Sequence, residues 1–149
     1  MSANVGRKQA GKEHRGNETA QAVALVREFF EATVATPEGF WNSFHAYFND
    51  GTIWENVGLA QTIGPEEATN FARAFPVQFH HMRIEDLVLS GEGNRIHAER
   101  VDHFCRQDGT IILTVRALGV IEIEGGKIAR WRDYFDTAGF LAAIGQQAG

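Results

Sequence analysis

The first part of the chain carries apolar residues every three or four positions. One set consists of Ala22, Leu25, Val26, Phe29 and Phe30. Its spacing predicts an amphipathic helix from about Glu18 to Thr33, with Asn17 as the N-cap. The next set consists of Phe40, Trp41, Phe44, Tyr47 and Phe48. It predicts a second helix, which the turn signal Asn49-Asp50-Gly51 ends.

The middle of the chain changes period. Residues Ile53 to Val57 predict a short strand. Gly64-Pro65 then opens a third helix that we expect to run to about Phe75, because proline suits the first helical turn. The pattern therefore places helices before most of the strands.

The remainder of the chain is typical of long strands joined by tight turns. Four strands are predicted at about Phe79–Leu89, Arg95–Arg106, Thr110–Glu122 and Lys127–Phe135, with glycine-containing turns between them. Short connections favour antiparallel neighbours. A closing helix is expected from Thr137 to Ile144. Helices followed by a meander indicate the α+β class.

Composition and charge narrow the function classes. At 149 residues the chain suits one domain, which we place at residues 17–149 behind a disordered, basic arm at residues 1–16. The net charge of −5 gives no basis for binding nucleic acid or an anionic membrane. The lone Cys105 suits a reducing cytoplasm and excludes an internal disulfide.

Strand alternation identifies the candidate chemistry. In Arg95–Phe104 the apolar face, which includes Ile96 and Phe104, also carries Arg100 and Asp102. In Lys127–Phe135 the face of Trp131 carries Asp133, whereas Ile128, Arg130, Arg132 and Tyr134 take the other face. Trp54 and Asn56 share a face of the short strand. Two acids, one arginine and one amide thus point into an aromatic interior.

Buried carboxylates must be paired or protonated. Two carboxylates on one guanidinium, with a single proton between them, form a neutral group in which one acid donates and the other accepts. That arrangement suits acid–base catalysis on a small uncharged substrate. The alternative is a structural salt bridge that ties two strands together.

Three motifs give a resemblance. They are Glu99-Arg100-Val101-Asp102, Leu118-Gly119-Val120 and Trp131-Arg132-Asp133-Tyr134-Phe135-Asp136. Together they resemble the limonene-1,2-epoxide hydrolase family. The resemblance implies an NTF2-like cone, in which three to four helices wrap a curved mixed or antiparallel sheet. It also implies a homodimer that needs no metal and no cofactor.

The resemblance implies a role for each site residue. Asp133 would be the base that takes a proton from water, and Asp102 the acid that protonates the epoxide oxygen. Arg100 would orient both carboxylates, and Asn56 would hold the attacking water. Trp54 stands where the family usually has a tyrosine, and an indole donates one hydrogen bond but accepts none. We expect Phe104, Val115, Ala117 and Phe135 to line the substrate pocket.

The same cone supports other functions. An isomerase would want an inward tyrosine, but Tyr134 points away from Asp133 by period. An epoxide-opening cyclase could use the same acid pair with a substrate hydroxyl in place of water. A small-molecule binding or dimerisation module would not need the acids for turnover. The strand Thr110–Glu122 is apolar on both faces, so a second subunit is expected to cover its outer side.

Overall fold

The computed structural model describes the backbone of residues 3–148 and the side-chain surroundings of residues 14–146. The helices are α1 (Ala3–Ala35), α2 (Gly39–Tyr47), α3 (Gly64–Arg73) and α4 (Thr137–Ala148). The strands are β1 (Phe48–Asn56), β2 (Ala60–Ile63), β3 (His81–Glu92), β4 (Arg95–Cys105), β5 (Ile111–Glu124) and β6 (Lys127–Phe135). Within this described part, no helix is both long and apolar enough to cross a bilayer.

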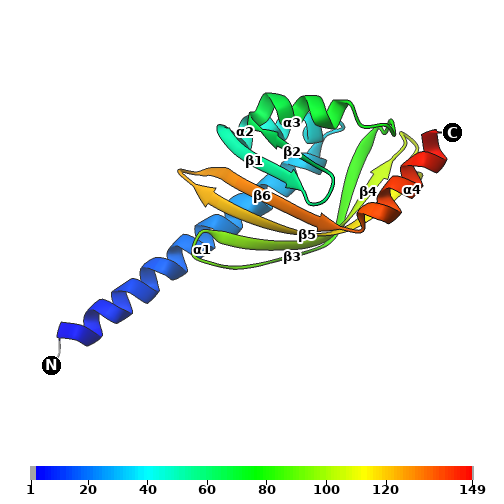
Figure 1. Cartoon of the computed structure of the whole chain (residues 1–149). Helices are drawn as coiled ribbons and strands as arrows, with labels where there is room; N and C mark the ends of the chain where they lie inside the picture. The colour runs from blue at the N-terminus through cyan, green and yellow to red at the C-terminus, as the bar shows by residue number, and fades with distance from the viewer. Residues whose placement is uncertain (1–2, 149) are drawn as a thin grey trace.

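The strands form one mixed sheet in the order β2-β1-β6-β5-β4-β3. The three hairpins from β3 to β6 are antiparallel, as the short turns predicted. β1 instead runs parallel to β6, which joins the early strand to the last one. Figure 1 shows the sheet twisted and curved, with α2 and α3 together beside β1 and β2 and with α4 at the end of the sheet where β6 finishes. The predicted α+β class, with helices packed on one mixed sheet, is confirmed.

Two groups of buried side chains pack against one face of the sheet. The larger group joins α1, α2 and α3 to the strands through residues such as Phe29, Phe44, Trp54, Ile121 and Trp131. The smaller group, around Met82, Phe104 and Leu113, lies toward α4 and includes Phe75 and Phe140. Burying these side chains is the main force that holds the helices on the sheet.

The first helix is longer than the sequence pattern predicted. We expected an arm without regular structure over residues 1–16 and a cap at Asn17, but α1 continues back to Ala3. Residues 1 and 2 lie outside the described residues. The added turns contain Ala, Lys, Arg, Gln and Glu residues, which have high helix propensity, but also three glycines, which do not. Their sequence has no apolar periodicity from which the helix could have been predicted. Figure 1 shows this part projecting beyond the sheet.

The strand that follows α2 also begins earlier than predicted. Phe48 belongs to β1 rather than to the helix, and Asn49-Asp50-Gly51 lies inside the strand. The Thr52 hydroxyl accepts a hydrogen bond from the Asn49 backbone N–H, and the Asn49 side-chain oxygen accepts hydrogen bonds from the Gly51 backbone N–H and the Thr52 hydroxyl. These side chains thus pair with backbone groups that would otherwise be paired within a turn. We did not predict β2, whose four residues carry little periodic signal.

The face of β6 on which Ile128 lies was predicted wrongly: strand alternation placed it with Arg130 and Tyr134, but it points into the core. The pairing of β5 with β6 shifts register between Glu122 and Ile123, where Glu122 pairs with Arg130 and Ile123 with Ile128. The irregularity turns Ile128 inward, where it is fully buried in the larger group. Beyond it the alternation is as predicted, with Trp131 and Asp133 buried and Tyr134 exposed.

Candidate active site

A cavity of about 410 Å³ lies between the two buried groups, and residues of both line it. Its apolar lining includes Phe30, Phe40, Phe71, Phe75, Met82, Ile84, Phe104, Val115, Phe135, Phe140, Leu141 and Ile144. Its charged and amide side chains are Asn56, Arg100, Asp102 and Asp133. An apolar pocket with a few convergent polar groups is the usual form of a small-molecule site.

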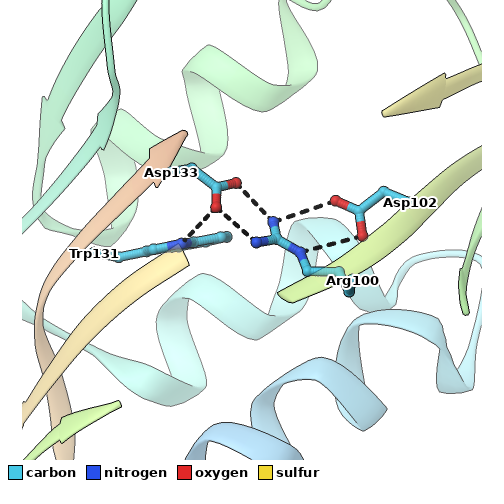
Figure 2. Close-up of polar contacts among 4 residues, drawn as sticks. All are labelled: Arg100, Asp102, Trp131 and Asp133. Atoms are coloured by element: carbon cyan, nitrogen blue, oxygen red, sulfur yellow. Dashed lines mark hydrogen bonds and ion pairs between the residues drawn. The ribbon is translucent and has the colours of Figure 1, made fainter. Parts of the chain in front are cut away.

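Arg100 joins the two aspartates, as Figure 2 shows. Its Nη1 and Nη2 donate to Oδ1 and Oδ2 of Asp133, each at 2.6 Å. Its Nε and Nη2 donate to Oδ1 and Oδ2 of Asp102, at 3.3 and 3.2 Å. All three side chains are buried. The predicted proximity of Arg100, Asp102 and Asp133 is therefore confirmed, and the shorter bonds go to Asp133.

The fold brings these residues together across three strands. Arg100 lies on β4 and Asp133 on β6, so the arginine side chain must cross β5. Gly119 of β5 pairs with Asp133 and leaves the space for this crossing. A Cβ at Gly119 would lie 3.2 Å from Nη1 of Arg100, 3.1 Å from Oδ1 of Asp133 and 3.0 Å from Nε1 of Trp131. The bridge between Arg100 and Asp133 therefore requires a residue without a side chain at position 119.

The surroundings set the charges of the bridge. Burial by itself lowers the pKa of Arg100, but the negative charges of Asp102 and Asp133 raise it overall, so the guanidinium keeps its proton. Burial raises the pKa of Asp102; Arg100 opposes this, and Asp133 adds to it by charge repulsion. Asp102 is therefore the carboxyl that favours its protonated form. The guanidinium also lies 4.9 Å from the ring centre of Phe30, a cation–π contact.

Asn56 faces the cavity beside Asp133. The two residues are register partners in the parallel pairing of β1 with β6. The Asn56 side chain is 8% exposed, and no hydrogen bond joins it to another side chain among the described residues. Its amide therefore has both donor and acceptor capacity left for a bound molecule.

Trp54 is also in the cavity wall, but its indole N–H does not reach the open space. The Nε1 atom is inaccessible to solvent and has no hydrogen-bond partner within the described residues. The ring instead stacks on Trp131, with centroids 5.1 Å apart and planes at 16°. Trp54 thus contributes a flat apolar surface to the cavity wall.

Three of the four residues predicted to line the pocket do line the cavity. Phe104, Val115 and Phe135 line the cavity, whereas Ala117 is buried but is not among the lining residues. We did not predict the helical contribution from Phe30, Phe71 or α4, because the sequence does not say which helix covers which strand. We also missed Trp131, whose Nε1 donates to Oδ1 of Asp133 at 3.2 Å. Its position two residues before Asp133 on the same strand face was the available signal.

The described residues hold no group of three or more His, Cys, Asp or Glu side chains arranged for a metal ion.

Comparison with protein families shows that residues 20–146 match the limonene-1,2-epoxide hydrolase catalytic domain. The chain belongs to this family. The resemblance given by the three motifs is therefore confirmed over most of the chain.

Individual relatives agree with this placement. Epoxide hydrolase EphG of Mycobacterium tuberculosis is 28% identical over 103 residues, which cover 65% of this chain and 63% of that relative. A solved LEH-like epoxide hydrolase of M. tuberculosis has a TM-score of 0.65 at 23% identity, and the aligned region covers 87% of this chain and 93% of the solved chain. A protein from Jannaschia sp. CCS1, described as a SnoaL-like polyketide cyclase, has a TM-score of 0.70 at 15% identity, covering 89% and 95%. The two solved structures share the fold of this chain, and this likeness confirms the predicted NTF2-like cone.

Proposed function

We propose that this protein is an epoxide hydrolase that adds water to an apolar epoxide and releases a vicinal diol. One observation carries the proposal: a single guanidinium joins two buried carboxylates at the polar part of an otherwise apolar cavity. Membership of the limonene-1,2-epoxide hydrolase family supports it. So does the EphG relative, named as an epoxide hydrolase.

The two carboxylates have different environments, which suggests different roles. Asp133 receives the two short bonds from Arg100, and these stabilise its ionised form as a base. Asp102 receives longer bonds, and burial raises its pKa, which suits an acid that starts protonated. In the proposed step, Asp133 takes a proton from water while the water oxygen attacks an epoxide carbon. The carbon–oxygen bond breaks, and Asp102 gives its proton to the epoxide oxygen.

Asn56 is the group that would hold the attacking water. Its amide faces the cavity next to Asp133 without a partner among the described side chains. A water between Asn56 and Asp133 would be oriented by one and deprotonated by the other. Because misplacing a nucleophile by about 1 Å costs on the order of 10² in rate, Asn56→Ala should lower turnover strongly. Asn56→Asp should do the same, because it adds a negative charge beside Asp133.

The lining also indicates the substrate class. Away from the bridge and Asn56, most lining residues are aromatic or aliphatic. Thr33 is an exception, but its hydroxyl already bonds to the Phe29 carbonyl oxygen. A substrate with one epoxide on an uncharged cyclic or terpenoid-like body would place its polar atom at the bridge and its apolar body against the apolar lining.

An isomerase is disfavoured because no tyrosine is among the lining residues, Tyr134 being exposed and Tyr47 bonded to Glu28. An epoxide-opening cyclase remains the rival, since the Trp54 position offers no hydroxyl for water.

The experiment is product analysis in ¹⁸O-labelled water with a panel of cyclic and aryl epoxides and no added metal. We expect one labelled oxygen per diol, and Trp54→Tyr should keep or raise this hydrolysis. Turnover that yields unlabelled product would replace hydrolysis by cyclisation. Full turnover by Asp133→Asn, with the fold intact, would remove the acid–base mechanism. Absence of turnover by the wild-type protein on every epoxide would favour a binding module.

A further inference from the structure

The base of the site has a second donor besides Arg100. The Trp131 indole N–H donates to Oδ1 of Asp133, the same oxygen that receives Nη1 of Arg100 (Figure 2). Among the described residues, Oδ2 receives a hydrogen bond from Nη2 of Arg100 alone. The two oxygens are therefore unequal, because Oδ1 already accepts two hydrogen bonds and Oδ2 accepts one. Oδ2 is the oxygen with capacity left to accept a proton from water.

The position of the Trp131 ring is fixed by its neighbours. The ring is 4% exposed and makes edge contacts with Phe29 and Phe30 at centroid distances of 5.4 and 6.0 Å. Trp54 covers it by stacking. The register of β1 with β6 pairs Trp54 with Trp131 and, two residues on, Asn56 with Asp133. One strand pairing thus sets both the stack and the polar pair.

The Trp54 N–H does not explain why a large indole occupies this place. It is buried and unpaired, which costs free energy rather than gaining it. The ring, however, has several aromatic neighbours: Phe44 packs at a tilt at a centroid distance of 5.1 Å, and Phe71 makes an edge contact at 5.6 Å. The contribution of Trp54 is therefore its flat ring, which is held by these contacts.

We propose that Trp54 and Trp131 are a pair of positioning residues: Trp54 holds the Trp131 ring so that its N–H occupies Oδ1 of Asp133 and leaves Oδ2 for the nucleophile. The kinetic consequences rest on the proposed hydrolysis, whereas the hydrogen bond does not. The role given to Trp54 replaces that of a water ligand with that of a support for the base.

The first test concerns Trp131. Trp131→Phe keeps an aromatic ring but removes the N–H, so Asp133 loses a donor that favours its ionised form. We expect kcat to fall about tenfold to a hundredfold with a much smaller change in KM. The pH profile of kcat/KM should change as well, because the variant removes a hydrogen-bond donor to Asp133. An unchanged profile, with kcat and KM as in wild type, would overturn the proposal.

The second test separates the ring of Trp54 from its N–H. Trp54→Phe removes the N–H but keeps a flat ring, and Trp54→Leu removes both. We expect Trp54→Leu to lose far more kcat than Trp54→Phe and to change the pH profile of kcat/KM in the same way as Trp131→Phe. Trp54→Leu should cause no further change in this profile when it is combined with Trp131→Phe. Equal losses in Trp54→Phe and Trp54→Leu would instead assign a hydrogen-bonding role to the indole.

A third measurement does not depend on turnover. The indole N–H resonances of Trp41, Trp54 and Trp131 can be assigned in ¹⁵N-labelled protein with single Trp→Phe variants, Trp41→Phe being the control outside the cavity. We expect Asp133→Asn to move the Trp131 resonance, and Trp54→Leu to speed hydrogen exchange at Trp131 more than Trp54→Phe does. A Trp131 resonance indifferent to residue 133 would refute the positioning pair even if epoxides are hydrolysed. Absence of turnover on every epoxide, with the coupling present, would refute only the hydrolase.

Discussion

At the scale of single residues, the site depends on an inequality between two chemically identical side chains. Asp102 and Asp133 share one arginine, but the hydrogen bonds to Asp133 are shorter by more than 0.5 Å. Asp133 also has a second donor in Trp131. Burial raises the pKa of Asp102. A carboxyl group that keeps its proton beside a differently bonded carboxylate can act with it as acid and base in one step.

The first prediction is that both aspartates are needed. Asp133→Asn removes the proton acceptor and Asp102→Asn removes the proton donor, and each group is typically worth on the order of 10²–10⁴ in rate. Because they act in the same step, the double variant should lose less than the product of the two single losses. Steady-state rates of diol formation measure this. Multiplicative losses would mean that the two residues act in separate steps.

The second prediction concerns pH. Burial raises the pKa of Asp102, so this carboxyl stays protonated above the ordinary range near 4 and ionises at higher pH. Rates should therefore fall on the alkaline side as pH rises through the raised pKa. The stability contribution has the same sign: it is present below the pKa of the unfolded chain and is lost as pH rises through that of the folded state.

The control for this pH dependence is Asp102→Asn, which cannot titrate. Its free energy of unfolding, measured by urea denaturation at a series of pH values, should decline less than that of wild type over the same range. Parallel curves for the two proteins would mean that Asp102 ionises alike in the folded and unfolded states.

At the scale of secondary structure elements, β5 determines whether a side chain on β4 can reach a side chain on β6. Arg100 and Asp133 lie on strands that do not touch, and only an inner face without a side chain at residue 119 lets the arginine cross. Strand alternation predicted which side chains point inward, but it could not predict this gap. A glycine in a strand has several possible reasons, and the pairing of strands decides among them.

The same limit explains what else could and could not be predicted. β6 was predicted with its observed ends, because Gly125-Gly126 and the alternation define it. The turn of Ile128 depends on a register shift against β5, which is a property of two strands together. Likewise, α4 was expected, but the side chains of Phe140, Leu141 and Ile144 in the cavity wall follow from packing alone.

The third prediction tests β5 directly. In Gly119→Ala the added methyl group would press on Arg100, Asp133 and Trp131 at 3.0 to 3.2 Å, so the bridge must shift by a few tenths of an ångström. We expect kcat to fall on the order of tenfold or more, with a smaller loss of stability. Gly51→Ala is the matched control, since its nearest neighbour would be Asn49 Oδ1 at 3.5 Å. Equal kinetics in the two variants would show that the crossing tolerates a side chain.

At the scale of the whole molecule, the sheet face opposite the cavity has a row of exposed side chains. Val88, Glu99, Leu118 and Tyr134 are register partners in succession across β3, β4, β5 and β6. Val88 is 62% exposed, Leu118 41% and Tyr134 44%. Apolar residues gathered on one exposed face often mark a contact with another subunit.

The fourth prediction is that this face forms the expected homodimer. Leu118→Glu would place a second carboxylate beside Glu99 and should shift the mass in solution from dimer toward monomer, measured by light scattering during size-exclusion chromatography. Ile63→Glu, at an exposed residue on β2, is the control and should leave the mass unchanged. A wild-type protein that is monomeric at all concentrations would refute the prediction.

The single guanidinium between the two acids has a consequence for the catalytic cycle. In the proposed reaction each turnover leaves a proton on Asp133 and removes one from Asp102, so the site ends in the reverse of its starting state. Arg100 cannot carry the proton back, because both neighbouring charges raise its pKa. The return must therefore use water or the diol hydroxyls in the cavity. For substrates whose diol leaves slowly and keeps water out of the cavity, the return of the proton from Asp133 to Asp102, rather than the opening of the epoxide ring, would then limit the rate.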